Sequence, residues 1–474
     1  MPTITAQFLD RPIFRIVSEI AAERGVRAFV IGGFVRDCFL GCPRSDIDIV
    51  VEGSGIDFAK AVGKRIKANV TYFKNFGTAM LHFGGDEVEF VGARKESYRR
   101  ESRKPIVEDG TLEDDQQRRD FTINAMAFSL QQEDFGALVD PFGGIRDLDA
   151  GIIRTPLDPD TTYSDDPLRM LRAVRFATRL STPEHPFTIV PESMASMRRM
   201  ADRLQILSCE RIAEELDKMM QTNDPARAFV LLDEAGLLPY VLPELLALKG
   251  VETVEGRGHK DNFAHSLAVL SNVAAVSDSL WLRWAALLHD IGKPATKRFD
   301  PAVGWTFHGH EVVGARMVPK IFGRLRLSMD EMKYVQKLVR LHLRPIALVD
   351  DEVTDSAVRR LLFDAGDDID DLMLLCNADI TSKNEAKVAR IRANFELVKR
   401  KLVEVEAKDA IRNFKNPIDG DYVMKVYGIP PCAQIGQLKE MVKEAILDGV
   451  IGNNFEEADA FMRQHASELG LHEV

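Results

Sequence analysis

Residues 29 to 51 read FVIGGFVRDCFLGCPRSDIDIVV, and this stretch decides the fold of the N-terminal part of the chain. Its two apolar runs are separated by Gly32-Gly33, a short helix-like stretch and a loop, which predicts a strand, a turn, a short helix and a second strand. Side chains alternate between the faces of a strand, so Asp46 and Asp48 point to one side while the isoleucines between and after them point into the core. The sequence therefore brings two carboxylates together.

Two carboxylates held close together repel each other unless a cation lies between them. Hard oxygen ligands of this kind suit Mg²⁺ bound together with a phosphate-bearing substrate. Gly32 and Gly33 let backbone amides approach a triphosphate, and Arg36 adds a guanidinium fork. An isolated Asp-x-Asp is more often a solvated surface strand. With the glycine turn beside it, the pair predicts a site for phosphoryl transfer.

The composition is that of a folded protein, with 45% hydrophobic and 28% charged residues in a chain of 474. The net charge of -11 argues against a uniformly basic nucleic-acid binder. Segments 94 to 104 and 383 to 401 are locally basic, which fits either a phosphate-binding face or an ordinary solvated surface. We find no apolar run long enough to span a bilayer and no signal-peptide pattern, and the cysteines lack a paired spacing. We expect a cytoplasmic protein with reduced thiols and no membrane contact.

The pattern of apolar residues and glycines changes after Asp166. Before it, from residue 28 to about 150, short apolar runs alternate with glycines, which predicts strands mixed with a few helices. After it, long stretches have helical spacing and few glycines. We therefore expect an α+β fold, in which a mixed β-sheet with helices is followed by domains built of helices alone.

Arginines recur at helical spacing in DDPLRMLRAVRFA, residues 165 to 177. Asp165 or Asp166 is expected to cap this helix, with a proline in its first turn. Arg169, Arg172 and Arg175 are spaced three apart and form one stripe, while apolar residues between them pack inward. Taken alone, the stretch is an amphipathic helix with solvated arginines, although such a stripe also suits a triphosphate.

Together these motifs resemble the tRNA CCA-adding and poly(A) polymerase family of nucleotidyltransferases. The segment GG-x-x-R-D followed by D-I-D-I-V-V is similar to the family's signature. The resemblance implies a two-metal mechanism in which Asp46 and Asp48 hold both Mg²⁺ ions. It also implies a third carboxylate from a neighbouring strand, for which DEVEFVGAR offers Glu87 or Glu89, and we favour Glu89.

The same resemblance implies the nucleotide-binding residues. RRDFTINAMAF, residues 118 to 128, is similar to the motif that contacts the sugar and phosphates, and DDPLR is similar to the motif that reads the Watson-Crick edge of CTP or ATP. Asp and Arg suit this task because their acceptor and donor atoms match the amino groups of cytosine and adenine. The charged stretch between Tyr98 and Leu112 is expected to be a loop that moves between additions. The implied nucleotide-binding set is Gly32, Gly33, Arg36, Arg119, Asp120, Asn124, Asp166, Arg169, Arg172 and Arg175.

Histidines gather in a later part of the chain, in HKDNFAHSLAVL, WAALLHDIGKPATKR, WTFHGHEVVGARM and VRLHLRP. His265, the His289-Asp290 dipeptide, His310 and Asp379 resemble the HD superfamily of metal-dependent phosphohydrolases. The resemblance implies a site for a divalent transition metal or Mg²⁺ that activates water against a phosphoester. The alternative is a degenerate HD fold that merely supports RNA.

These resemblances divide the chain into a nucleotidyltransferase head (1–150), a helical neck that binds nucleotide and RNA (151–250), an HD domain (251–395) and a helical RNA-binding tail (396–474). The first hypothesis is addition of CMP and AMP from CTP and ATP to the 3′ end of tRNA, with HD phosphohydrolysis as a further activity and no obligatory protein partner. Poly(A) polymerase and CC-only or A-only addition are alternatives. So is an HD phosphohydrolase with an inactive head, whereas a noncatalytic RNA-binding protein is disfavoured because both head aspartates are present.

Overall fold

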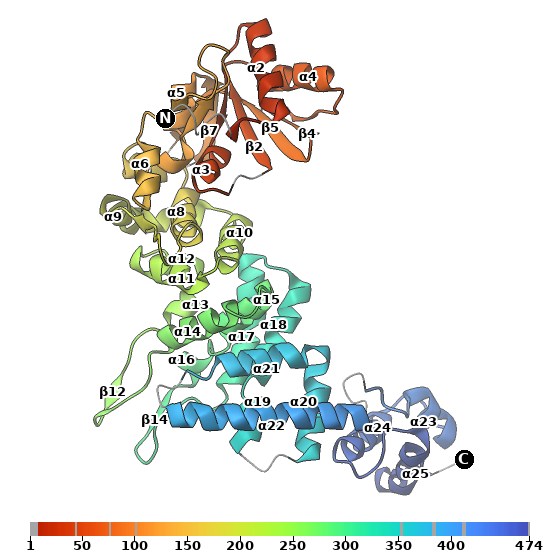
Figure 1. Ribbon diagram of the computed structural model, residues 1–474. Coiled ribbons are helices and arrows are strands. Elements are labelled where there is room, and N and C mark those ends of the chain that lie inside the picture. Colours follow the sequence, from red (N-terminus) through yellow and green to blue (C-terminus); the bar gives the residue numbers. More distant parts are fainter. Residues whose placement is uncertain are drawn as a thin grey trace. The chain divides into compact units, whose positions relative to one another are not determined.

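The computed structural model describes residues 8–42, 45–74, 77–99, 102–350, 354–381, 385–409 and 414–472. Contacts within the chain form two compact units, unit 1 (Met1–Pro243) and unit 2 (Glu244–Val474) (Figure 1). The α+β prediction is confirmed, because unit 1 begins with a mixed β-sheet accompanied by helices and the rest of the chain is mostly helical. Within the described ranges, no helix is both long and apolar enough to cross a membrane.

The sheet of unit 1 has seven strands in the order β3-β4-β5-β2-β1-β8-β9. Its neighbouring strands are antiparallel except for β2 and β5, which run parallel. Helix α4 (Gly55–Ile66) packs on one face of the sheet, with α2 (Pro12–Arg24) beside it (Figure 1). The strands are β1 (Ala28–Ile31), β2 (Asp46–Val51), β3 (Thr71–Phe73), β4 (Thr78–Phe83), β5 (Asp86–Gly92), β8 (Ala127–Ser129) and β9 (Leu138–Val139).

A β-hairpin, not a loop, occupies most of the charged stretch between Tyr98 and Leu112. It consists of β6 (Arg94–Arg99) and β7 (Ser102–Asp109), which pair antiparallel. A proline within this stretch suggested a loop, but an isolated pair of strands has an outer edge where a missing N–H costs no ladder hydrogen bond. The hairpin tip, Arg100 and Glu101, lies outside the described residues. Movement of this element stays a prediction.

Helices make up the rest of unit 1, interrupted by a two-stranded parallel pair of β10 (Ile152–Ile153) and β11 (Thr188–Ile189). This pair is a small exception to the prediction of helices alone after residue 150. The helices are α3 (Gly33–Phe39), α5 (Leu112–Gln117), α6 (Gly144–Asp149), α7 (Pro159–Asp165), α8 (Leu168–Arg179), α9 (Pro191–Met200), α10 (Cys209–Met220), α11 (Pro225–Glu234), α12 (Leu238–Val241) and α13 (Pro243–Leu246), the last of which crosses into unit 2.

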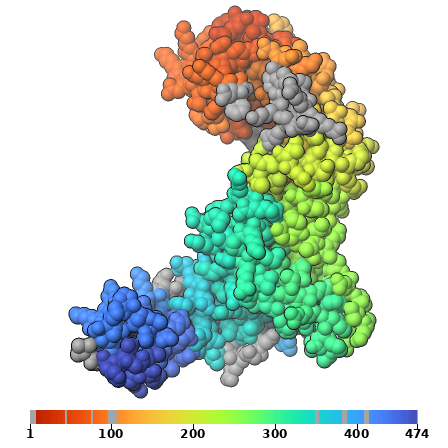
Figure 2. Space-filling model, turned by 180° about the vertical axis from the view of Figure 1, so that it is seen from behind, coloured from red at the N-terminus to blue at the C-terminus, as the bar shows by residue number. Residues whose placement is uncertain are grey.

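Unit 2 is helical apart from two small antiparallel hairpins. These are β12 (Thr253–Val254) with β13 (Arg257–Gly258) and β14 (Arg298–Asp300) with β15 (Gly304–Thr306), and the two hairpins lie side by side (Figure 1). Figure 2 shows the surface of this part of unit 2 in green. The helices are α14 (Asn262–Ala274), α15 (Leu280–Leu288), α16 (Lys293–Thr296), α17 (His310–Leu325), α18 (Met329–Leu341), α19 (Arg344–Asp350), α20 (Asp355–Ala365), α21 (Ile369–Ala378), α22 (Glu385–Asp409), α23 (Gly420–Tyr427), α24 (Ala433–Leu447) and α25 (Phe455–Ala466).

The basic segment 383–401 falls mainly within helix α22, although residues 383 and 384 lie outside the described part of the chain. All five cysteines are free, as expected. The described residues of the 94–104 segment belong to the β6–β7 hairpin. RNA contact by either segment stays a prediction.

Candidate active sites in the two units

The register of β2 against β5 places the predicted carboxylates on one face of the sheet. Asp46 pairs with Glu87 and Asp48 pairs with Glu89, and paired residues of parallel strands point the same way. The opposite face carries Phe90, whose ring lies 5.9 Å from that of Phe58 on α4. The acidic face of the sheet is therefore the one turned away from α4.

The carboxylate of Asp48 is crowded by like charges. Burial raises its pKa to about 6 against the pull of Arg119, and the negative charges of Asp46 and Glu89 add to the increase. A divalent cation bound by these oxygens would remove the repulsion, so the donor set fits Mg²⁺. Glu89 is half-buried beside Asp48, whereas Glu87 is exposed.

The glycine turn brings the backbone against this acidic face. Gly32 has φ +81°, and a Cβ added there would lie 2.8 Å from Nη1 of Arg119 and 3.5 Å from Oδ2 of Asp48. A side chain at this position would therefore strain the backbone and displace an arginine. Gly33, the first residue of α3, is different, because a Cβ there would meet only Nη2 of Arg36 at an ordinary 3.6 Å. Of the two glycines, Gly32 is the one that the turn requires.

A buried polar network fixes the side chains that are predicted to contact the sugar and phosphates of the nucleotide. Nη1 of Arg36 donates to Oδ1 of Asn124 at 2.5 Å, and Nδ2 of Asn124 donates to Oδ1 of Asp120 at 3.0 Å. The other oxygen of Asp120 accepts from Nε of Arg172 at 2.7 Å. Burial opposes ionisation of Asp120, but Arg172 and Asn124 outweigh it and lower the pKa of the carboxyl to about 2. The chain of bonds thus fixes two arginines around one ionised aspartate.

Helix α8 begins at Leu168, with Pro167 in the N-cap position instead of the expected Asp165 or Asp166. Asp165 ends α7, whereas Asp166 has the extended backbone conformation that a capping residue usually has, and Pro167 after it is already helical. Oδ1 of Asp166 accepts from the backbone N–H of Leu168 at 3.2 Å. The aspartate therefore satisfies an N-terminal amide of the helix from one position further upstream.

The three arginines of the predicted stripe all have protein partners, and Arg169 and Arg175 are buried while Arg172 is half-buried. Arg169 donates to the carbonyls of Arg118 at 2.5 Å and Thr162 at 3.3 Å. Arg175 donates through Nε to Oε2 of Glu215 at 2.6 Å, and both side chains are buried. With Arg172 bonded to Asp120, each guanidinium plane is held by a partner on a different element.

Most of the residues predicted to bind metal or nucleotide line two neighbouring cavities. The first, of about 250 Å³, is lined by Gly33, Phe34, Arg36, Asp37, Asp46, Asp48, Arg119, Asp120, Asn124, Arg172, Arg175, Phe176 and Arg179. The second, of about 310 Å³, is lined by Arg118, Arg119, Asp120, Asp166, Leu168, Arg169, Arg172 and Arg211. The carboxylate pair thus belongs to one cavity and the Asp166–Arg169 pair to the other, with a shared wall between them. Glu89 and Gly32 are not among the lining residues of either cavity.

Sequence reasoning missed two buried acids that orient these arginines. Asp115 accepts from Nε of Arg118 at 2.9 Å and from Nε of Arg119 at 3.1 Å. Its spacing of three and four residues on a helical turn was a signal that could have revealed it. Glu215 on α10 had no such signal, because its partner Arg175 is distant in the sequence.

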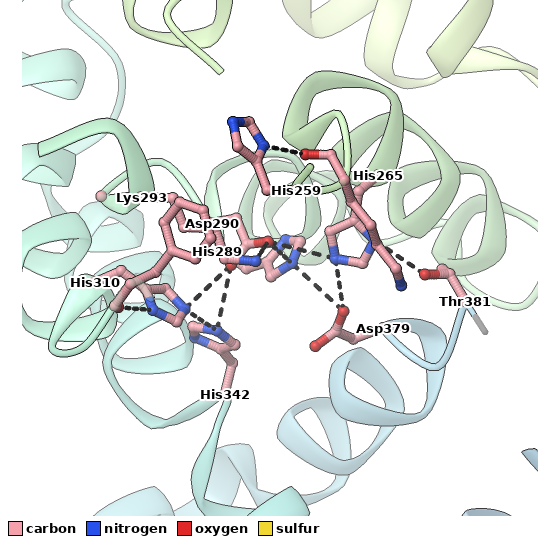
Figure 3. A network of polar contacts seen from close by, with 12 residues as sticks. His259, His265, His289, Asp290, Lys293, His310, His342, Asp379 and Thr381 are labelled. Carbon is pink, nitrogen blue, oxygen red and sulfur yellow. Dashed lines mark hydrogen bonds and ion pairs between the residues drawn. The ribbon is translucent and has the colours of Figure 1, made fainter. Parts of the chain in front are cut away.

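The predicted HD residues of unit 2 meet in one cluster (Figure 3). Nε2 of His265 lies 2.9 Å from Oδ1 of Asp379, and Nε2 of His289 lies 3.2 Å from Oδ2 of Asp290. Nε2 of His310 lies 3.2 Å from Oδ1 of Asp290. These residues come from the start of α14 and α17 and from the residues just after α15 and α21. The tertiary structure therefore gathers side chains from four helices.

His342 completes the cluster and was missed as a site residue, although its segment VRLHLRP was noted. It directly follows α18, and its Nε2 lies 3.4 Å from Nε2 of His310 and 3.8 Å from Oδ1 of Asp290. Burial and the neighbouring His289 lower the pKa of His342 to about 4. Burial also opposes the charging of His289, but Asp290 and Asp379 raise its pKa to about 10.

The cluster has the chemistry of a metal site. Nε2 of His289 is buried, and its approach to Asp290 lacks the geometry of a hydrogen bond. Its Nδ1 lies 2.8 Å from the carbonyl of Ala286, which orients the ring with Nε2 toward the carboxylates. Imidazole and carboxylate donors together fit a divalent transition metal.

A cationic cavity of about 330 Å³ opens beside this cluster. Lys293 connects the two, because it lines the cavity and its Nζ lies 2.6 Å from Oδ2 of Asp290. The hairpins β12–β13 and β14–β15 form much of the wall. The lining residues are Arg257, Gly258, His259, Lys260, Asn262, Lys293, Val303, Gly304, Trp305 and Phe307.

Three families of known domains match successive parts of the chain. Residues 28–154 match the "Poly A polymerase head domain", and residues 186–248 match the "Probable RNA and SrmB- binding site of polymerase A". Residues 262–383 match the "HD domain". The first two matches lie around the cavities of unit 1, apart from an unmatched stretch that holds α8, and the third contains the histidine cluster.

Whole proteins are similar to most of this chain. The "A-adding tRNA nucleotidyltransferase" of Deinococcus radiodurans is 34% identical over 368 residues, which cover 75% of this chain and 80% of that protein. The "Multifunctional CCA protein" of Aromatoleum aromaticum is 34% identical over 349 residues, covering 71% and 81%. A solved tRNA nucleotidyltransferase, complexed with a primer tRNA and an incoming ATP analog, aligns with a TM-score of 0.56 at 26% identity and covers 81% of this chain and 98% of that one.

Proposed function

Because the chain belongs to the tRNA nucleotidyltransferase family, we propose that it adds CMP and AMP, taken from CTP and ATP, to the 3′ end of tRNA. The observation that carries the proposal is the β2–β5 register, which lines up Asp46, Asp48 and Glu89 on one face beside the glycine turn. Residues 1–150 act as the catalytic head and 151–250 as the neck. Residues 251–395 form the HD domain, and 396–474 form an RNA-binding tail.

Asp46 and Asp48 would hold the catalytic Mg²⁺ ions, with Glu89 supporting them. When bound, Mg²⁺ supplies charge neutralisation on the triphosphate and activation of the RNA 3′ hydroxyl. Arg119 and Arg172 bind the phosphates, since both guanidinium groups border the carboxylate cavity and are oriented by buried acids. Preorganised cations of this kind lower the barrier to phosphoryl transfer because they need no rearrangement during the reaction.

Asp166 and Arg169 select the base in the second cavity. The Asp166 carboxylate accepts from the amino group of cytosine or adenine, and Arg169 donates to a ring nitrogen or carbonyl. The bonds from Arg169 to the Arg118 and Thr162 carbonyls hold its plane in a fixed position. Guanine and uracil present a carbonyl where the carboxylate needs a donor, so they are rejected.

The test uses tRNA transcripts that lack the 3′ terminus, end in C, or end in CC, each incubated with single and mixed nucleoside triphosphates. CCA addition predicts that all three acceptors are completed to the same length and that growth then stops. Extension of the CC-ended acceptor alone would indicate an A-adding enzyme instead. Continued growth with ATP would indicate a poly(A) polymerase, and incorporation that survives Asp48→Asn would refute the head assignment.

A second activity, phosphohydrolysis by the HD domain, is favoured by one observation. The histidine and aspartate cluster adjoins a cavity whose Arg257, Lys260 and Lys293 suit a phosphate ester. A metal bound there would supply a nucleophilic water. The test compares two Mn²⁺-dependent hydrolyses: release of phosphate from p-nitrophenyl phosphate, and opening of a terminal cyclic phosphate on RNA to a phosphomonoester. His289→Ala should abolish both reactions without affecting CMP incorporation, and unchanged hydrolysis would exclude this activity.

A further inference from the structure

The carboxylate of Asp290 divides the histidine cluster into two halves (Figure 3). Its Oδ2 faces Nε2 of His289 at 3.2 Å and Nε2 of His265 at 3.4 Å. Its Oδ1 faces Nε2 of His310 at 3.2 Å and Nε2 of His342 at 3.8 Å. Each oxygen thus belongs to a separate group of possible ligands. Asp379 joins only the first group.

The ring tautomers of the second group follow from their neighbours. Nδ1 of His310 lies 2.7 Å from the carbonyl of Phe307, and Nδ1 of His342 lies 2.7 Å from the carbonyl of Val339. A carbonyl oxygen can only accept, so each Nδ1 carries a hydrogen and each neutral ring has a bare lone pair on Nε2. These two lone pairs face each other at 3.4 Å and also face Oδ1 of Asp290.

Three acceptors therefore converge at a buried point. A proton placed on one ring would form one hydrogen bond and leave the third acceptor without a donor. A divalent cation satisfies all three, because imidazole nitrogen and carboxylate oxygen are both ordinary metal donors. The Nδ1 bonds to backbone carbonyls are the orienting contacts that metal-ligating histidines generally have.

We propose that unit 2 binds two divalent transition-metal ions bridged by Asp290, with His310 and His342 as ligands of the second ion. The first ion takes His265, His289 and Asp379. The inference rests on the HD part of the proposed function and adds to it, since a single-metal site leaves the His310–His342 pair without a role. Oδ2 of Asp290 also accepts from Nζ of Lys293, which leaves its second lone pair for the first ion.

A bridged pair of ions narrows the class of substrate. Two cations held by one carboxylate can bind two oxygens of the same phosphate, which suits in-line hydrolysis of phosphate esters. Lys293 contacts the bridging carboxylate and also lines the cavity beside it, where its ammonium group adds positive charge. The site is therefore matched to an anionic phosphate group.

The experiment counts metal in the full chain. The Asp46→Ala and Asp48→Ala substitutions are introduced first, so that the head contributes no ions. The protein is loaded with Mn²⁺ and desalted, and bound manganese is measured by elemental analysis and by electron paramagnetic resonance. Two Mn²⁺ per chain with a spin-coupled spectrum are expected. His310→Ala or His342→Ala should each leave one Mn²⁺ with an uncoupled six-line spectrum.

His308→Ala is the matched control, because this exposed histidine lies two positions from His310 outside the cluster. It should retain both ions and the coupling. One uncoupled Mn²⁺ in the parent protein would overturn the two-ion proposal while leaving the HD metal site in place. The absence of bound Mn²⁺ would overturn both the two-ion proposal and the HD metal site. CMP incorporation is measured separately, on protein with an unmodified head. Since the parent protein decides the count, a variant that fails to fold leaves the test intact.

Discussion

Replacing Glu215 tests whether a buried acid positions the nucleotide-binding arginine Arg175. The two side chains are 4% and 6% exposed and form an ion pair at 2.6 Å. Glu215→Gln keeps the shape but leaves the guanidinium charge buried without a counter-charge. Breaking a buried pair in this way costs about 3 to 5 kcal/mol. For a unit of this size, that loss lowers the melting temperature by on the order of 10 °C.

The activity should change together with the stability. Arg175 lines the cavity that holds the carboxylate pair, so a displaced guanidinium weakens nucleotide binding and raises KM for CTP more than it lowers kcat. Thermal melting and steady-state incorporation of CMP measure the two effects. A double variant with Arg175→Met and Glu215→Leu should recover much of the stability, because the buried charges are gone, but not the affinity for CTP.

The neighbouring Glu214 provides the matched control. Its side chain is 62% exposed and pairs with Lys218 at 2.5 Å one helical turn away. An exposed pair of this kind contributes well under about 1 kcal/mol, so Glu214→Gln should melt within about 2 °C of the parent protein. If Glu215→Gln melts and binds CTP like Glu214→Gln, the positioning role of Glu215 is refuted.

Further substitutions in unit 1 separate chemistry from stability. Asp48→Asn should lower incorporation by on the order of 10³-fold, yet in EDTA at pH 7.5 it should stabilise the fold by about 1 to 3 kcal/mol. The reason is that the pKa of Asp48 in the folded protein, about 6, lies above the ordinary 3.8, so the native protein loses folding stability as the pH rises from about 4 to 6. A lower melting temperature for Asp48→Asn under these conditions would contradict this reasoning. Gly32→Ala should cost about 1 to 3 kcal/mol and disturb Arg119, whereas Gly33→Ala should be mild, as equilibrium unfolding would reveal. Asp166→Ala should relax base choice, measured as the ratio of UMP to CMP incorporation, and an unchanged ratio would place selection elsewhere.

Local patterns in the sequence determined much of the head site. Alternation along a strand was enough to place Asp46 and Asp48 on one face, because side-chain direction in a strand depends only on position. Helical spacing likewise predicted α8 and its arginines, and could have revealed Asp115 beside Arg119. Local chemistry misled at one edge of structure, where the charged segment containing Pro105 forms a hairpin strand instead of a loop.

Only the tertiary structure decided which distant residues meet. The choice between Glu87 and Glu89 depends on the register of β5 against β2, which no pattern within either strand specifies. The pairing of Glu215 with Arg175 and the arrival of His342 on the far side of Asp290 depend on how whole helices pack. Propensity and periodicity act over a few residues, whereas the position of a buried charge is set by partners that the folded core brings to it.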